Sequence, residues 1–233
     1  MKDDEIDDIL KHAAGASPDI DPAVLERVTE SLASSLHPVR PMAASWVLVS
    51  ALVLVCGCVA IAGAVLLGPY GIGKMSALEI TLILPVVGSL IWLAAVASVR
   101  EMIPGSSHPF AQWVVPAGSS LALVAVFALA FDHYGTERFV PQGLKCLSAG
   151  LLFALPAALA GWLVLSRGFA VNQIAAGLAQ GVLAGLAGIG MLELHCANFE
   201  GPHQMLWHVA VLPLCGAAGV LAVWLIRSRN PKR

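Results

Sequence analysis

The stretch AAGLAQGVLAGLAGIG, residues 175–190, has the composition of a helix that packs inside a membrane protein. Gly177, Gly181 and Gly185 form two overlapping GxxxG steps, and Gly188 lies close to the same stripe. In lipid, helices associate by close backbone packing, which a groove of glycines permits. We therefore expect a tightly packed central helix, and we interpret these glycines as packing residues rather than as the lining of a substrate channel.

The composition of the whole chain places this helix in a membrane. Of its 233 residues, 58% are hydrophobic and 12% are charged, whereas a soluble domain has about 25% charged residues. Apolar runs of about 20 residues, long enough to cross a bilayer, recur along the chain. They cover residues 43–68, 77–98, 112–131, 146–166, 172–192 and 206–226. The sequence therefore predicts an all-α membrane protein in which residues 43–226 form a bundle of six transmembrane helices.

The positions of Lys and Arg predict the orientation of these spans, because cytoplasmic segments carry an excess of them. Ten of the 13 basic residues fall in the N-terminal segment, the second and fourth connections and the basic C-terminal end, residues 227–233. The other three fall in the remaining connections. Both termini are therefore predicted to be cytoplasmic. The acidic start MKDDEIDD lacks the basic and apolar regions of a signal peptide.

Residues 1–42 are predicted to form a cytoplasmic tail of two short amphipathic helices, since their apolar residues recur at helical spacing. The apolar stripe consists of Ile6, Ile9, Leu10, Leu25, Val28 and Leu32. The tail has nine acidic and four basic residues, whereas a helix on a membrane surface is usually rich in Lys and Arg. An acidic amphipathic tail suits docking into a groove of a basic protein partner. The alternative is that these apolar faces lie on the membrane or on the bundle.

A second unusual stretch is ELHCANFEGPHQMLWH, residues 193–208, which is the predicted last extracytoplasmic connection. Cys146, at the mouth of the fourth span, faces the same compartment. The candidate metal ligands are Cys146, His195, Cys196, His203 and His208. Thiolate and imidazole groups suit zinc, copper or another thiophilic ion. The spacing H-C-x6-H-x4-H, however, is not that of a known zinc finger.

Two other interpretations of these residues stay open. Cys146 and Cys196 could form a disulfide in an oxidising compartment, provided that their Cα atoms lie within about 7 Å of each other. Alternatively, the histidine-rich stretch only anchors two helix ends in the headgroup layer, an interpretation that Trp207 supports because aromatic residues favour that boundary.

Several functional classes are disfavoured by the sequence. It contains no GxSxG or HExxH motif and no phosphate-binding loop, so we expect neither an enzyme nor a required cofactor. It has no basic patch for direct contact with nucleic acid. A transporter usually carries an ionisable residue inside its spans, whereas Glu79 and Glu193 lie at the outer ends of theirs. A metal or small-solute transporter, or a structural membrane subunit, is the alternative function.

Three short stretches resemble a known family of membrane regulators. VREMIPG, residues 99–105, resembles a family signature in the second connection. KCLSAGLLFALPAALAGWLVLSRG, residues 145–168, resembles the fourth span, with Cys146 at its outer end. LHC, residues 194–196, follows a glycine-rich span and places Cys196 where the family has its second cysteine. The family is NrsF, the small six-span anti-sigma factors that regulate an extracytoplasmic-function (ECF) sigma factor.

The resemblance implies a function for both ends of the molecule. In such proteins the two outward-facing cysteines, here Cys146 and Cys196, are implicated in sensing thiophilic metals or oxidants. The cytoplasmic part holds an ECF sigma factor inactive at the bacterial inner membrane. We therefore expect a sigma factor and the lipid bilayer as partners, and a thiophilic metal ion as a signal. The tail matches no family segment residue by residue, so the resemblance does not supply a sigma-binding surface, and His203 and His208 are additions to the family pattern.

Overall fold

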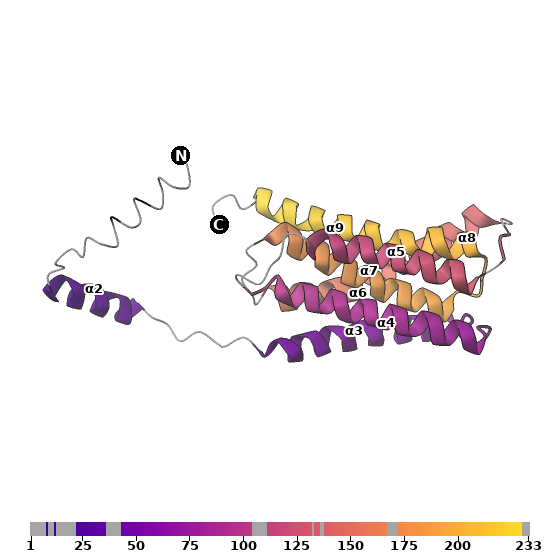
Figure 1. Cartoon of the computed structure of the whole chain (residues 1–233), viewed down its shortest axis with the longest axis horizontal. Helices are drawn as coiled ribbons and strands as arrows, with labels where there is room; N and C mark the ends of the chain where they lie inside the picture. Colours follow the sequence, from indigo (N-terminus) through magenta and orange to yellow (C-terminus); the bar gives the residue numbers. More distant parts are fainter. Residues whose placement is uncertain are drawn as a thin grey trace. The chain divides into compact units, whose positions relative to one another are not determined.

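The chain divides into two compact units, Met1–Pro41 and Met42–Arg233. Figure 1 shows the fold as a computed structural model. The structure describes residues 8, 12, 22–35, 43–103, 111–131, 133–135, 138–166 and 172–229.

The second unit is built from helices. They are α3 (Ser45–Leu67), α4 (Ala77–Arg100), α5 (Ala111–Ala130), α6 (Phe139–Leu165), α7 (Gln173–His195), the short α8 (Gly201–His203), the π-helical turn η1 (Gln204–His208) and α9 (Val209–Arg229). Among the described residues, six helical runs are long and apolar enough to cross a membrane, the last of them comprising α8, η1 and most of α9. None of the residues that the structure describes forms a strand. The predicted fold class, an all-α protein with six membrane-spanning helices, is confirmed.

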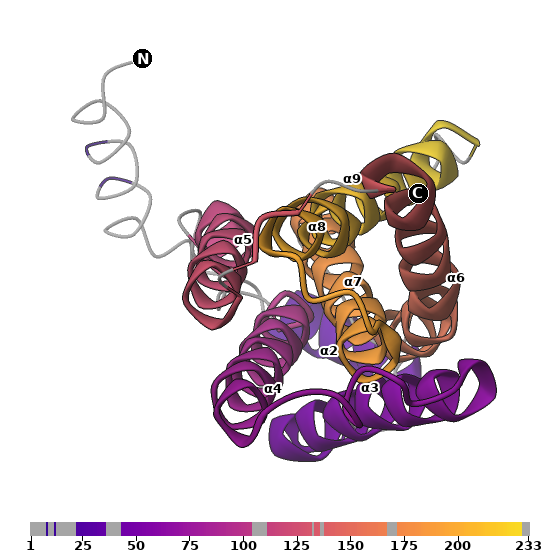
Figure 2. The same cartoon turned by 90° about the vertical axis from the view of Figure 1, so that its right-hand side faces the viewer.

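Helix α7 lies at the centre of the bundle. Figure 2, a view along the helices, shows α3, α4, α5, α6 and α9 arranged around it. In its most apolar stretch 83% of the residues are buried, against a third or less in each of the other spans. The outer helices therefore turn most of their apolar side chains away from the bundle, as expected where lipid is the solvent.

Glycines bring α7 into direct backbone contact with α9. Gly177, Gly181 and Gly185 all face that helix. A Cβ atom built at Gly177 would lie 2.7 Å from the carbonyl oxygen of Gly219, and one at Gly181 would overlap the carbonyl oxygen of Cys215. Any side chain at these two positions would therefore push the helices apart.

Two helix boundaries differ from the prediction in a way that matters for the site. Helix α6 begins at Phe139, so Cys146 lies two turns inside the helix and not at its mouth. The predicted last connection is mostly helical, because α7 continues to His195 and helix resumes at Gly201. The polar composition of that stretch is typical of a solvated loop, but four of its polar side chains are buried: Glu193, His203, Gln204 and His208.

In the first unit, α2 (Pro22–Ser35) presents an apolar stripe. Leu25, Val28 and Leu32 follow the helical repeat and are 57%, 50% and 60% exposed. None of the described residues of this unit covers these three side chains. The other predicted stripe residues, Ile6, Ile9 and Leu10, lie outside the described residues.

Candidate functional site

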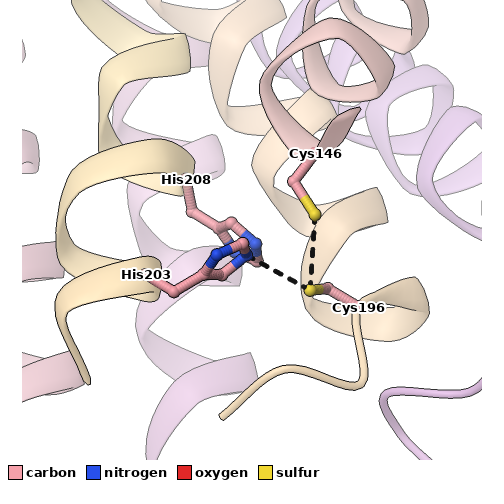
Figure 3. Close-up of side chains that lie close together, drawn as sticks. All are labelled: Cys146, Cys196, His203 and His208. Atoms are coloured by element: carbon pink, nitrogen blue, oxygen red, sulfur yellow. Dashed lines mark hydrogen bonds between the residues drawn. The ribbon is translucent and has the colours of Figure 1, made fainter. Parts of the chain in front are cut away.

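A group of four metal-ligating side chains lies at one end of the bundle, and Figure 3 shows how they converge. Cys146 comes from α6, Cys196 directly follows α7, His203 ends α8 and His208 ends η1. Their ligand atoms all lie within 4.8 Å of one another. Cys146 is half-buried and the other three are buried. We call these four residues the thiol–imidazole cluster, which unites four of the five predicted metal ligands.

The two sulfur atoms of the cluster are in contact. Cys146 Sγ lies 3.5 Å from Cys196 Sγ, and Cys196 Sγ lies 3.6 Å from Nε2 of His203. Both cysteines are free thiols. Two thiols at this distance can bind one thiophilic ion together, or an oxidant can join them, because a disulfide requires sulfur atoms about 2.05 Å apart. The geometry therefore suits both kinds of thiol chemistry.

The π turn brings the two histidines together. In an α-helix, residues five apart point in directions about 140° apart. A π turn closes hydrogen bonds between residues i and i+5, which brings such residues close together on one face. The rings of His203 and His208 accordingly lie 5.4 Å apart, centroid to centroid. Nothing in the sequence pattern indicated this turn, and it builds half of the cluster.

Glu193 is a partner of the cluster that the sequence interpretation missed. Its Oε1 lies 2.7 Å from Nδ1 of His208, and both side chains are completely buried. Glu193 precedes Cys196 by three residues on α7, a spacing that puts both on one side of the helix. That spacing was the signal available in the sequence.

His195 does not join the cluster. Its Nδ1 lies 2.8 Å from the carbonyl oxygen of Gly68, and its ring packs against Tyr70. The backbone N–H of Gly71 also donates to the carbonyl of Leu194 at 3.1 Å. These contacts tie the end of α7 to the segment between α3 and α4, so His195 holds the site's framework in place.

The headgroup-anchor interpretation does not fit the histidines of the cluster. His203 and His208 are 0% exposed, so their rings do not reach a membrane surface. Trp207 is half-buried and packs against Phe139 of α6. These two histidines therefore face the protein interior.

An open cleft of about 700 Å³ leads to the cluster. Two of its lining residues are the cysteines, and His203 is a third. The charged residues that line it are Lys74, Arg138, Lys145 and Glu200. The cleft gives a small solute access to the thiols.

Cys196 is held as a neutral thiol by its surroundings. The contact with the Cys146 thiol raises the pKa of Cys196 above its ordinary value, and burial raises it further. The imidazoles of His203 and His208 act in the opposite direction, but more weakly. The thiolate is the form that binds metals and attacks electrophiles, so a metal ion must displace the proton of Cys196 in order to bind.

Fold and site together define a multi-pass helical membrane protein with a buried cluster of thiol and imidazole groups. Residues 32–227 match the family model of NrsF, described as negative regulator of sigma F. The match covers most of the chain, which therefore belongs to the NrsF family, and the resemblance seen in the sequence is confirmed. Its role is accordingly that of a negative regulator of a sigma factor, with a sigma factor as its partner. Searches of curated proteins and of solved structures returned no match.

Proposed function

We propose that this chain is a membrane anti-sigma factor that binds an ECF sigma factor and releases it when a thiophilic metal ion or an oxidant reaches Cys146 and Cys196. The observation that carries the proposal is the 3.5 Å contact between the two sulfur atoms. A divalent ion would replace the two thiol protons. A two-electron oxidant would take two electrons and two protons and leave a disulfide. Neither reaction makes the chain an enzyme, and the ion is a signal rather than a cofactor.

The distribution of charge supports an orientation in a bacterial inner membrane. Three basic residues line the cleft beside the cluster: Lys74, Arg138 and Lys145. The other ten belong to the N-terminal segment, the second and fourth connections and residues 227–233. By the excess of basic residues on the cytoplasmic side, both termini are cytoplasmic and the cluster is extracytoplasmic. The cluster is then exposed to external ions and oxidants, while the tail is exposed to the sigma factor.

The apolar stripe of α2 is the proposed sigma-factor contact. Leu25, Val28 and Leu32 are at least half exposed, and the tail that bears them is acidic. A sigma factor contacts DNA and therefore carries basic surface. Apolar residues flanked by acidic ones fit a basic groove by both hydrophobic contact and charge.

Helices α7 and α9 provide the physical connection between signal and release. The cluster joins the end of α7 to the segment that leads into α9, and the same two helices pack backbone to backbone along the membrane. A signal can act only if it favours one of two arrangements that differ in affinity for the sigma factor. Drawing the cysteines and histidines closer would change the α7–α9 packing, and through it the state of the cytoplasmic end.

The proposal is tested in cells by a reporter gene that the sigma factor transcribes. We expect Zn²⁺ or a thiol oxidant to induce the reporter in the wild type, and Cys146→Ser and Cys196→Ser each to abolish induction. Cys58→Ser, the same substitution at an exposed cysteine of α3, is the matched control and should leave induction intact. Unchanged induction in both cluster variants would refute sensing by these thiols.

The sigma-factor contact is tested by co-purification with the full-length chain. A triple variant with Leu25, Val28 and Leu32 changed to Ser should retain little sigma factor, because it removes the apolar stripe and leaves the acidic charge unchanged. Glu26→Ser, on the same helix, serves as the control and should retain binding within about tenfold, since exposed charge pairs contribute about 0.2–1 kcal/mol. Full retention of the sigma factor by the triple variant would exclude α2 as the contact.

A further inference from the structure

Glu193 is a carboxylate buried completely at the end of α7, beside the thiol–imidazole cluster. Carboxylates are almost never fully buried unless they are paired, and inside a membrane protein they are costly and mark functional positions. Oε1 of Glu193 lies 2.7 Å from Nδ1 of His208, whose side chain is also 0% exposed. The carboxylate therefore makes its direct contact with one residue of the cluster, His208.

The carboxylate determines which nitrogen of His208 faces the cluster. A carboxylate oxygen accepts hydrogen bonds, so the tautomer of His208 that donates from Nδ1 fits its contact with Glu193, and in that tautomer Nε2 carries the lone pair that binds an ion. That Nε2 is buried and has no hydrogen-bond partner among the described residues. In metal sites, a ligating histidine almost always donates its other N–H to a carboxylate, a carbonyl or water. The Glu193–His208 pair has this arrangement.

The four ligand atoms of the cluster are close to the spacing of a tetrahedral site. Around an ion with bonds of about 2.0–2.3 Å, tetrahedral ligand atoms lie about 3.3–3.8 Å apart. The sulfur atoms of Cys146 and Cys196 already lie 3.5 Å apart. All pairs lie within 4.8 Å, so the largest separation has to shorten by about 1 Å to match that tetrahedral spacing.

We propose that the thiol–imidazole cluster is a closed four-ligand site for a thiophilic divalent cation of tetrahedral preference, of which Zn²⁺ is the type, and that Glu193 is its positioning residue. Glu193 presents Nε2 of His208 to the ion. Binding releases the two thiol protons to solvent, and the two thiolates then balance the double charge of the ion. This inference rests on the proposed function, because the ion is the signal that the cysteines receive.

The surroundings of the cluster favour this class of ion over hard cations. The cleft is lined by three basic side chains and one carboxylate, Glu200, so the charge around it attracts no cation. Selectivity therefore comes from the donors themselves. Sulfur and imidazole nitrogen bind soft and borderline metals, whereas Ca²⁺ and Mg²⁺ require oxygen ligands.

The site is tested with the full-length protein, purified in detergent without metal and titrated with Co²⁺. We expect one Co²⁺ per chain, a sulfur-to-cobalt charge-transfer band and the intense visible bands of tetrahedral cobalt, all removed when Zn²⁺ displaces the Co²⁺. Mg²⁺ should displace nothing. A weak octahedral spectrum, or no binding of Co²⁺ and Zn²⁺, would overturn the proposal.

The role of Glu193 is tested by two substitutions at that position. Glu193→Gln keeps an oxygen that accepts from Nδ1 of His208, whereas Glu193→Leu keeps the approximate size and removes the acceptor. We expect Zn²⁺ affinity to fall about 10- to 100-fold in Glu193→Leu and to be largely rescued in Glu193→Gln. Glu101→Leu removes another buried carboxylate, which directly follows α4 at the end of that helix away from the cluster. This variant should leave the Zn²⁺ affinity unchanged. Wild-type affinity and spectrum in Glu193→Leu would refute positioning.

A further measurement observes His208 in the wild type and uses a variant only to assign its signals. With ¹⁵N-labelled histidine and bound Zn²⁺, the ring of His208 should be protonated at Nδ1 and coordinated through Nε2, its signals being assigned by their loss in His208→Ala. Coordination through Nδ1 would refute the role of Glu193.

Binding and signalling can fail separately. If neither Co²⁺ nor Zn²⁺ binds while the two cysteine variants abolish induction, this inference is wrong and the proposed function stands. If the tetrahedral spectrum appears while the cysteine variants leave induction unchanged, the site stands and the sensing function is wrong.

Discussion

The sulfur of Cys196 is surrounded by groups that oppose one another. Its contact with Cys146 and its burial favour the protonated thiol, whereas the two imidazoles of the cluster favour the thiolate. The thiol therefore keeps its proton to a higher pH than an exposed cysteine does. Cys196 therefore reacts slowly as a nucleophile while it is in contact with the Cys146 thiol, and it becomes more reactive when that contact changes.

The reactivity of Cys196 should follow from this raised pKa. Because only the thiolate is alkylated, we expect alkylation by a maleimide to be slow at neutral pH and to rise at a higher pH than for an exposed cysteine. In Cys146→Ala, which removes the largest cause of the shift, the alkylation profile should move to lower pH. Mass spectrometry of the peptide that contains Cys196 provides the measurement. Identical profiles in both proteins would show that the thiol contact does not set the pKa.

At the scale of the element, η1 is the feature on which the cluster depends most. It places two histidines five residues apart on one face, which a regular α-helix does not do. Leu206 lies within the turn and is 53% exposed, so its removal costs little packing.

Deleting Leu206 should leave the cluster intact. The deletion puts the two histidines four residues apart, and residues at that spacing share one face of an α-helix. We expect the tetrahedral Co²⁺ spectrum to persist in this variant. Inserting an alanine after Leu206 should abolish it, since the histidines then point apart. Loss of the spectrum after the deletion and not after the insertion would contradict this account of the turn.

The α7–α9 contact makes a prediction about stability. At Gly181 a Cβ atom would overlap a backbone carbonyl of α9, whereas at Gly88 of α4 it would meet nothing within 4 Å. Gly181→Ala should therefore destabilise the bundle by about 1–3 kcal/mol through overpacking. Gly88→Ala should be neutral or stabilise it by up to about 1 kcal/mol, because alanine favours helix. Unfolding of both variants in SDS measures the difference, and equal stability would exclude tight packing at Gly181.

The elements were predicted where the signal was long and repetitive, and were missed where it was local. Apolar runs of about 20 residues indicate membrane spans whatever their neighbours are, so all six were found. The glycine spacing likewise identified α7. The start of α6 was placed late because its first turns carry polar residues such as Gln142 and Lys145. The π turn and the pairing of Glu193 with His208 arise from tertiary contacts and not from a repeat in the sequence. The spacing of Glu193 and Cys196 indicated only that the two residues share one side of a helix.

At the scale of the whole molecule, the residues of the proposed signal site and those of the proposed sigma-factor contact belong to different units. The cluster and Glu193 lie entirely within Met42–Arg233, and α2 lies within Met1–Pro41. Sensing and sigma-factor binding should therefore be separable by truncation.

Removing residues 1–41 should abolish binding of the sigma factor and leave the metal site intact. We expect the truncated chain to bind Co²⁺ with the tetrahedral spectrum and with an affinity close to that of the wild type, since all four ligands and Glu193 remain. Co-purification and the Co²⁺ titration measure the two effects. A truncated chain that still retains the sigma factor would place the contact in the bundle.

Glu193 also bears on how the chain is assembled during its synthesis. Helix α7 is the least apolar of the six spans and carries a carboxylate whose partner, His208, belongs to the span that follows it. Released alone into lipid, it would expose glycine backbone and an unpaired acid, both unfavourable there. We therefore expect α7 to stay beside the insertion machinery until α9 emerges, and the two to leave it as a pair. The span that contains α9 would then act as an intramolecular chaperone for α7.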